Sequence, residues 1–113
     1  MIVTTTYEIA GKRIVSTLGL VRGNSIRARH VGKDILAALR NLVGGEIPEY
    51  TKMMAEAREQ ALDRMVEEAR SYGANAVVAV RFQTAEMMKG AAELLAYGTA
   101  VVVEAADPAG PGS

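Results

Sequence analysis

The residues with the clearest binding chemistry lie in the segment GLVRGNSIRARH, residues 19–30, which contains three arginines and the only histidine of the chain. Guanidinium groups bind phosphates and carboxylates through two parallel hydrogen bonds. The chain has neither the GxxxxGK[ST] nor the GxGxxG spacing of nucleotide-binding loops. We expect a turn at residues 23–24 that presents the arginines to a small anion or, as we prefer, to acidic side chains of a neighbouring subunit. These arginines are Arg22, Arg27 and Arg29.

Two carboxylates and a phenol follow in the segment VGGEIPEY, as Glu46, Glu49 and Tyr50. A pair of carboxylates can supply the acid and the base of a hydrolase, but only at a separation and in surroundings that a sequence does not give. The start of a helix explains the glutamates more simply, because negative side chains are stabilising at the positive end of the helix dipole. Ser25 and His30 are close in sequence but lack an orienting carboxylate. We therefore predict no catalytic residue and no enzyme.

Metal binding has few candidate ligands in this chain. Soft heavy metals select thiolate and imidazole, and the chain has no cysteine and one histidine, His30. His30 and Asp34 are four residues apart and can share one face of a helix, but zinc requires three or four ligands. A symmetric ring of subunits could supply the missing ligands. A metal ion is accordingly the one cofactor that we consider, and a histidine at a helix start beside an exposed aspartate is the simpler interpretation.

Composition narrows the class of partner. Thirteen basic residues balance thirteen acidic ones, so no net charge attracts nucleic acid. No apolar run approaches the roughly 20 residues that span a bilayer, and the opening residues lack the features of a signal peptide. We expect no nucleic-acid partner and no membrane partner. Together with the absence of cysteine, this composition predicts a cytoplasmic protein.

The first elements that position these residues are two predicted strands. The segments IVTTT, residues 2–6, and RIVSTLGLV, residues 13–21, are rich in β-branched residues. In the second segment both alternating sets of side chains are apolar, which predicts a sheet that is covered on both faces. Gly19 within it suggests close approach by another backbone.

Two helices are expected next. Apolar residues recur at threes and fours from residue 30 and predict a helix that stops at residues 44–45. A second helix is predicted from about residue 46 to residue 72, with Ala57 in its apolar stripe. At 1.5 Å per residue it would be about 40 Å long, whereas a compact domain of this size has a radius of gyration of about 13 Å. We expect the end of this helix to reach a neighbouring subunit.

The remaining elements complete an α+β domain. The valines of NAVVAVRFQ predict a strand over residues 76–83, and a longer strand with a bulge near Gly98 is expected over residues 91–104, after a hairpin turn at Gly90. The order β, β, α, α, β, β is that of an α+β fold. We expect one domain over residues 1–104 and a flexible tail over residues 105–113, which is rich in Pro and Gly.

Several segments of this chain together carry a family resemblance: VGGE at 43–46, Tyr50, AREQAL at 57–62, GANAVV at 73–78 and YGTAVVV at 97–103. They resemble the YbjQ-like family, also called UPF0145, which is often described as heavy-metal-binding. The resemblance covers about residues 2–104. It implies a homopentamer with a mixed, mainly antiparallel sheet and one long helix in each subunit, packed around a five-fold axis. Such a ring needs a heterologous interface, to which we assign Arg27, Ala57 and Gly98.

Three positions depart from the family pattern. Gln83 stands where an aspartate is common, Ala85 where a serine is common, and Lys33 where an arginine is usual. The missing carboxylate at position 83 weakens a metal site that would have used it.

These observations predict a non-catalytic homopentamer that binds a small anion or a metal ion at subunit interfaces. The resemblance assigns no biochemical role. A ring that is purely structural or that interacts with other proteins is the alternative, and an enzyme is less favoured. The candidate ligand-binding residues are Arg22, Arg29, Glu46, Glu49 and Tyr50, and the candidate metal ligands are His30 and Asp34.

Overall fold

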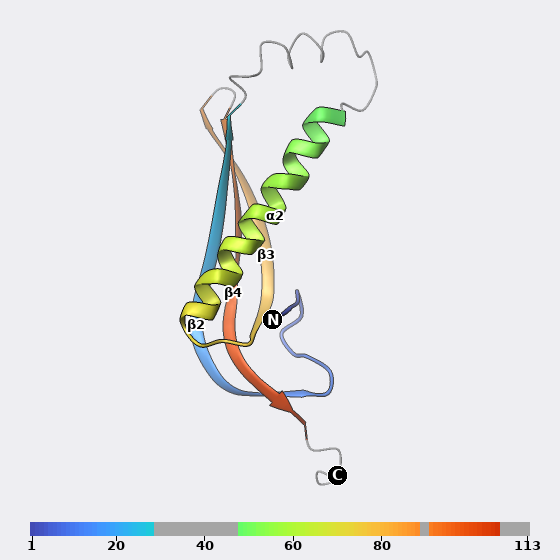
Figure 1. The fold of residues 1–113 in the computed structure, drawn as a ribbon, viewed down its shortest axis with the longest axis vertical. Coiled ribbons are helices and arrows are strands. Elements are labelled where there is room, and N and C mark those ends of the chain that lie inside the picture. Colours follow the sequence, from blue (N-terminus) through green and yellow to red (C-terminus); the bar gives the residue numbers. More distant parts are fainter. Residues whose placement is uncertain (29–47, 89–90, 107–113) are drawn as a thin grey trace.

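A computed structural model describes residues 1–28, 48–88 and 91–106 of the chain (Figure 1). The described residues form one sheet and one long helix, which confirms the α+β class. The elements are β1 (Ile2–Val3), β2 (Lys12–Ala28), α2 (Pro48–Ser71), β3 (Ala76–Met88) and β4 (Ala91–Ala105). The expected helix from residue 30, the hairpin turn at Gly90 and the tail after residue 106 lie outside the described residues.

The sheet is mixed and mainly antiparallel, as expected. Its strand order is β1-β3-β4-β2, with β1 parallel to β3 and the other pairs antiparallel. The sheet therefore has β2 at one edge, and β1 covers only the first residues of β3 at the other edge. The helix α2 lies across one face of the sheet, mainly against β2 and β4 (Figure 1).

The helix α2 confirms the sequence prediction and explains how it packs. Its buried side chains recur every four residues along one stripe of small and flexible residues, which are Ala57, Ala61, Met65 and Ala69. Methionine adapts to the space that the alanines leave, so the chain builds a core with few aromatic residues. Tyr72, predicted to end this stripe, is 51% exposed.

The connection from α2 to β3 explains part of the GANAVV segment. Gly73 has a φ of 86°, the left-handed conformation that commonly ends helices. Its amide donates to the Arg70 carbonyl at 2.9 Å, and the amide of Ala74 donates to the Ala69 carbonyl at 3.1 Å. The side chain of Asn75 then pairs with the backbone of Val103 through two hydrogen bonds of 2.8 Å, and so replaces a strand residue at this end of the sheet.

The predicted turn at residues 23–24 is wrong, because β2 runs through it to Ala28. Gly23 is buried against the helix backbone. A Cβ atom built on Gly23 would lie 2.2 Å from the carbonyl oxygen of Ala61 and 2.3 Å from the amide nitrogen of Met65. The close backbone approach expected at Gly19 is therefore at Gly23, since nothing lies within 4 Å of a Cβ built on Gly19.

The bulge near Gly98 is present but belongs to the other strand. The register passes from Val78 opposite Thr99 to Arg81 opposite Tyr97, so two residues of β3 face one residue of β4, Gly98. One of those two residues, Ala79, has a φ of 56°. The extra residue turns the next side chain, Val80, into the core that packs against α2.

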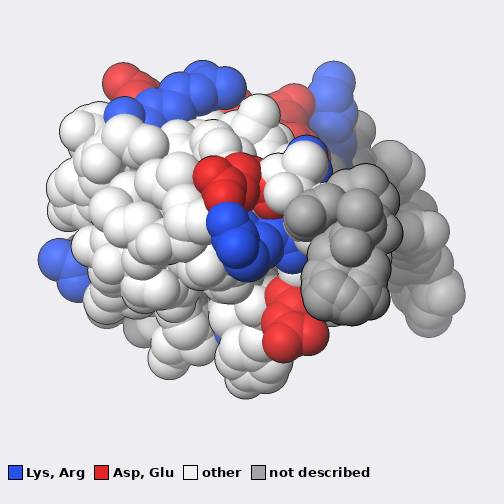
Figure 2. Space-filling model, turned by 90° about the horizontal axis from the view of Figure 1, so that it is seen from below, with Lys and Arg blue, Asp and Glu red and all other residues white. Residues whose placement is uncertain are grey.

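Within the described part of one chain, α2 covers one face of the sheet, so the cover of both faces stays a prediction. The core lies between α2 and the sheet. On the opposite face only one end is covered, where Ile9 of the N-terminal segment packs against valines of β3 and β4. Farther along that face, Leu20 is 61% exposed and Ile26 is 50% exposed. Figure 2 shows the lower end of the molecule, where a broad uncharged surface lies beside a few charged side chains.

We predict that Gly23→Ala destabilises the subunit by about 1–3 kcal/mol or more, because its Cβ would overlap the helix backbone, which cannot rotate away as a side chain can. Chemical denaturation measures this loss. Ser16→Ala, an exposed change on the same strand, is expected to stay within about 0.5 kcal/mol of the wild type. Equal stability of the two variants would contradict the close contact.

Candidate binding face

The sheet face opposite α2 carries the functional side chains that the structure describes. Residues directly opposite one another in antiparallel strands point to the same face. The register of β2, β4 and β3 therefore places a row of side chains from each strand on this surface, which we call the open face: Leu20, Arg22, Asn24, Ile26, Arg81, Gln83, Ala85, Glu93, Leu95, Tyr97 and Thr99. It combines exposed apolar side chains with two arginines.

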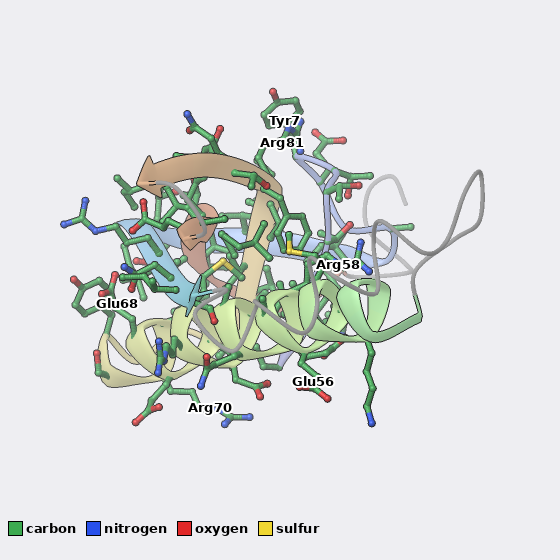
Figure 3. The ribbon with its side chains drawn as sticks, turned by 90° about the horizontal axis from the view of Figure 1, so that it is seen from above. Tyr7, Glu56, Arg58, Glu68, Arg70 and Arg81 are labelled. Atoms are coloured by element: carbon green, nitrogen blue, oxygen red, sulfur yellow. The ribbon has the colours of Figure 1, made fainter. Side chains whose placement is uncertain are left out.

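The two arginines of the open face have different surroundings. Both lie directly opposite Tyr97, one from each side, so the three residues form a row across the strands. The guanidinium of Arg81 donates to the Thr5 carbonyl at 2.8 Å, and its Cζ atom lies 5.7 Å from the centre of the Tyr7 ring. Figure 3 shows this pair on the side of the sheet away from α2. Arg81 thus holds the N-terminal segment on the sheet.

Arg22 is exposed, and its guanidinium forms no hydrogen bond or ion pair with another residue in the described part of the chain. Beside it lies a depression of about 500 Å³, lined by Arg22, Gly23, Asn24, Glu68, Glu93 and Leu95. Both carboxylates of this depression already accept protein hydrogen bonds. Glu68 accepts from the backbone amide of Arg22 at 3.2 Å, and Glu93 accepts from the side-chain amide of Asn24 at 3.0 Å. An anion would find one guanidinium available there.

The helix also caps the edge of β2. In addition to the bond from the Arg22 amide to Glu68, the guanidinium of Arg64 donates to the backbone carbonyl of Asn24 at 2.6 Å. Both strand groups point away from β4, where an edge strand normally presents unpaired backbone to solvent. Sequence reasoning missed these two helix residues. Their spacing of four residues beside the buried stripe was visible, but the strand edge beneath them was not.

Ser25 is a structural residue in this fold. It is fully buried between β2 and α2, and its hydroxyl lies 2.7 Å from the side-chain oxygen of Gln60. A buried hydroxyl that is hydrogen-bonded in this way is satisfied and has no access to a substrate. A catalytic pair with Ser25 as the nucleophile and His30 as the base cannot be described, because His30 lies outside the described residues.

The structure does not bring the predicted ligand-binding residues together within its described part. Arg29, His30, Asp34 and Glu46 lie outside the described residues. Glu49 and Tyr50 lie in the first turn of α2, and Arg27 lies in β2 opposite Ala92; the side chains of these three residues are outside the description.

The two small residues assigned to the interface serve the packing of the subunit itself. Ala57 is 1% exposed within one chain, on the buried stripe of α2. Gly98 is also buried, and a Cβ atom there would lie 2.8 Å from a methyl group of Val77. Both residues are therefore core positions within one chain, and their assignment to a subunit interface stays a prediction.

The described residues do not fit a heavy-metal centre. No group of three or more histidine, aspartate or glutamate side chains that could hold a metal ion occurs among them. The chain also has no cysteine, the ligand that soft metals prefer. Among the described residues, no helix is both long enough and apolar enough to cross a membrane.

We predict that Arg81→Ala releases the N-terminal segment from the sheet, because it removes the hydrogen bond to Thr5 and the contact with Tyr7. A hydrogen bond to a charged group contributes about 1.5–3 kcal/mol, less at an exposed site. Hydrogen exchange measured by mass spectrometry should be faster in residues 4–8. Arg13→Ala, which removes the exposed ion pair with Glu104, is the control and should leave that exchange unchanged.

Comparisons with known protein sequences match this chain to one family. The sequence model of the YbjQ family, described as "Putative heavy-metal-binding", matches residues 1–104. A UPF0145 protein of Dehalococcoides mccartyi is 59% identical over 104 residues, which are 92% of this chain and 100% of that protein. A UPF0145 protein of Methanosarcina acetivorans is 60% identical over 103 residues, 91% of this chain and 97% of that protein. Neither name assigns a catalytic activity.

A solved structure shares the fold. The crystal structure of a protein of unknown function from the DUF74 family of Pediococcus pentosaceus superposes with a TM-score of 0.65. The two sequences are 17% identical, and the match covers 92% of this chain and 98% of that one. At this identity the likeness concerns the fold alone.

Proposed function

Because this chain belongs to the YbjQ family, or UPF0145, we propose that it is a non-catalytic homopentameric ring that binds a small anion on the inner surface formed by its open faces. The observation that carries the proposal is the open face itself, where exposed Leu20 and Ile26 flank the available guanidinium of Arg22. Exposed apolar side chains interleaved with a binding group are typical of a surface that is completed by association.

The shape of the chain supports assembly. Its radius of gyration is 18.7 Å, and it extends over 63 × 27 × 16 Å. A compact domain of this length has a radius of gyration of about 13 Å. An elongated two-layer subunit leaves a large part of its apolar surface in water, and packing against further copies is the usual way to bury such surface.

The position of α2 supports an inward orientation of the open face. The helix covers the other side of the sheet, and its outward side chains are mostly charged, among them Glu56, Glu67 and Arg70. Figure 3 shows Glu56 and Arg70 pointing away from the sheet. A charged helix layer suits the outside of a ring, so five open faces with five copies of Arg22 would meet around the axis.

An anion is a better ligand than a metal for these side chains. The described donors fit a heavy metal poorly, whereas a guanidinium without a described partner is a good ligand for phosphate or carboxylate. Binding of a metal ion between subunits, through His30 and Asp34, is the second candidate, favoured by the description of the family. A ring that only interacts with other proteins is the third, and the apolar residues Leu20 and Ile26 favour it.

We predict that native mass spectrometry of the tag-free protein gives a pentamer. In Leu20→Glu the pentamer should be lost or strongly reduced, because the substitution puts five like charges on facing surfaces. Circular dichroism should remain that of the wild type, since Leu20 is 61% exposed within one subunit. Glu56→Gln, on the outward side of α2, serves as the control and should remain a pentamer. A monomeric wild-type protein would remove the ring from consideration.

For the ligand, we predict that inorganic phosphate raises the melting temperature of the wild type and that Arg22→Ala abolishes this rise. Arg22→Lys should keep part of it, because an ammonium retains the charge without the two parallel hydrogen bonds. Arg13→Ala is the control for loss of a positive charge elsewhere. If zinc ions raise the melting temperature and phosphate does not, metal binding replaces the anion as the function.

A further inference from the structure

The depression beside Arg22 is lined by charged groups of both signs. One is the guanidinium of Arg22, and the other two are the carboxylates of Glu68 and Glu93. Arg22 forms no ion pair with either carboxylate in the described part of the chain. The three charged groups therefore stand apart around one space of about 500 Å³.

Each carboxylate is held in place by one hydrogen bond and keeps one oxygen for a ligand. Oε1 of Glu68 accepts from the backbone amide of Arg22, and Oε2 of Glu93 accepts from the side-chain amide of Asn24. The second oxygen of each carboxylate accepts no hydrogen bond from a described residue. Both glutamate side chains are half-buried. Acceptors that are already held in place lose little conformational freedom when a donor binds them.

A ligand that carries only negative charge fits this lining poorly. Contact with the guanidinium would bring its charge near two carboxylates, and like charges repel. A ligand with an ammonium group beside its carboxylate avoids the repulsion. Its carboxylate accepts two parallel hydrogen bonds from Arg22, and its ammonium group, with three N–H donors, can donate to the free oxygens of Glu68 and Glu93.

The same depression has an apolar part. Leu95 is half-buried in its lining and lies opposite Asn24 in the register of β2 and β4. An apolar ligand side chain that covers Leu95 would remove apolar surface of both from water, which is favourable.

We propose that the anion bound at Arg22 is the carboxylate of a free α-amino acid with an apolar side chain, whose ammonium group binds the carboxylates of Glu68 and Glu93. The inference rests on the proposed anion binding and names its ligand class. The hydroxyl groups of a sugar phosphate could donate to the same oxygens. They carry no positive charge, however, and would leave the two carboxylates beside the phosphate unbalanced.

Calorimetric titration of the tag-free full chain tests the ligand class with two acids that differ in one group. Free leucine and isocaproate have the same carboxylate and the same branched side chain, but isocaproate lacks the ammonium group. We expect the Kd of leucine to be at least about 10-fold lower, because its ammonium group donates to charged acceptors. Equal affinities, or binding of inorganic phosphate without binding of either acid, would overturn the inference and leave anion binding in place.

Two further outcomes of the titration are decisive. Tighter binding of glycerol phosphate than of leucine would show that the ligand donates from hydroxyl groups, and the inference would be wrong. If leucine, isocaproate and inorganic phosphate all fail to bind, the proposed anion binding and this inference fail together.

Glu93→Gln tests the ammonium contact directly. The amide side chain keeps the size of glutamate and an oxygen for the hydrogen bond from Asn24, but it has no negative charge. The affinity for leucine should fall, whereas that for isocaproate should stay the same or rise, because a like charge is removed from beside its carboxylate. Glu56→Gln, outside the depression, is the matched control and should change neither affinity. If Glu93→Gln changes both affinities equally or leaves both unchanged, the ammonium contact is wrong.

Discussion

The contact between the backbone of α2 and Gly23 of β2 sets the arrangement of the other elements. It brings the carbonyl of Ala61 and the amide of Met65 so close to the strand that no Cβ fits between them. The alanines of the buried stripe allow this short distance along the helix. Because the closest contact is at the edge strand rather than at the centre of the sheet, α2 covers β2 and β4 and leaves the second half of β3 bare.

Because α2 lies nearer to β2 than to β3, the two edges of the sheet differ. On the side of β2, Arg64 and Glu68 are near enough to bond the strand backbone. On the side of β3, the outward amides of Phe82 and Thr84 have no partner among the described residues, and Phe82 is 44% exposed. Within the described part of the chain, one helix faces three long strands and contacts mainly two of them, β2 and β4. In the proposed ring, further copies would cover the apolar side chains that the described part of one chain leaves exposed.

The sequence predicted the elements with strong periodicity and missed those that depend on distant neighbours. The helix expected over residues 46–72 and the long last strand are present, because their patterns are local. The turn expected at residues 23–24 is absent, because glycine here accommodates a helix backbone rather than a turn. A fully apolar strand predicted two covered faces, but a sequence does not distinguish cover by its own chain from cover by another copy. The two kinds of cover leave the same pattern in the sequence, because the same side chains are buried in each case.

In the candidate site, too, the sequence predicted what local residues determine and missed what depends on distant residues. Arginine chemistry identified Arg22, and the structure places it on the open face with a guanidinium that no described residue engages. The role of Arg81 was not visible in the sequence, because its partners Thr5 and Tyr7 lie more than seventy positions away. These two arginines flank one tyrosine, but Arg81 already donates from Nη1 to the carbonyls of Thr5 and Val80, whereas the guanidinium of Arg22 has no partner among the described residues. In the proposed ring, symmetry would repeat the guanidinium of Arg22 five times around the axis, each copy beside the carboxylates of Glu68 and Glu93, which already accept hydrogen bonds.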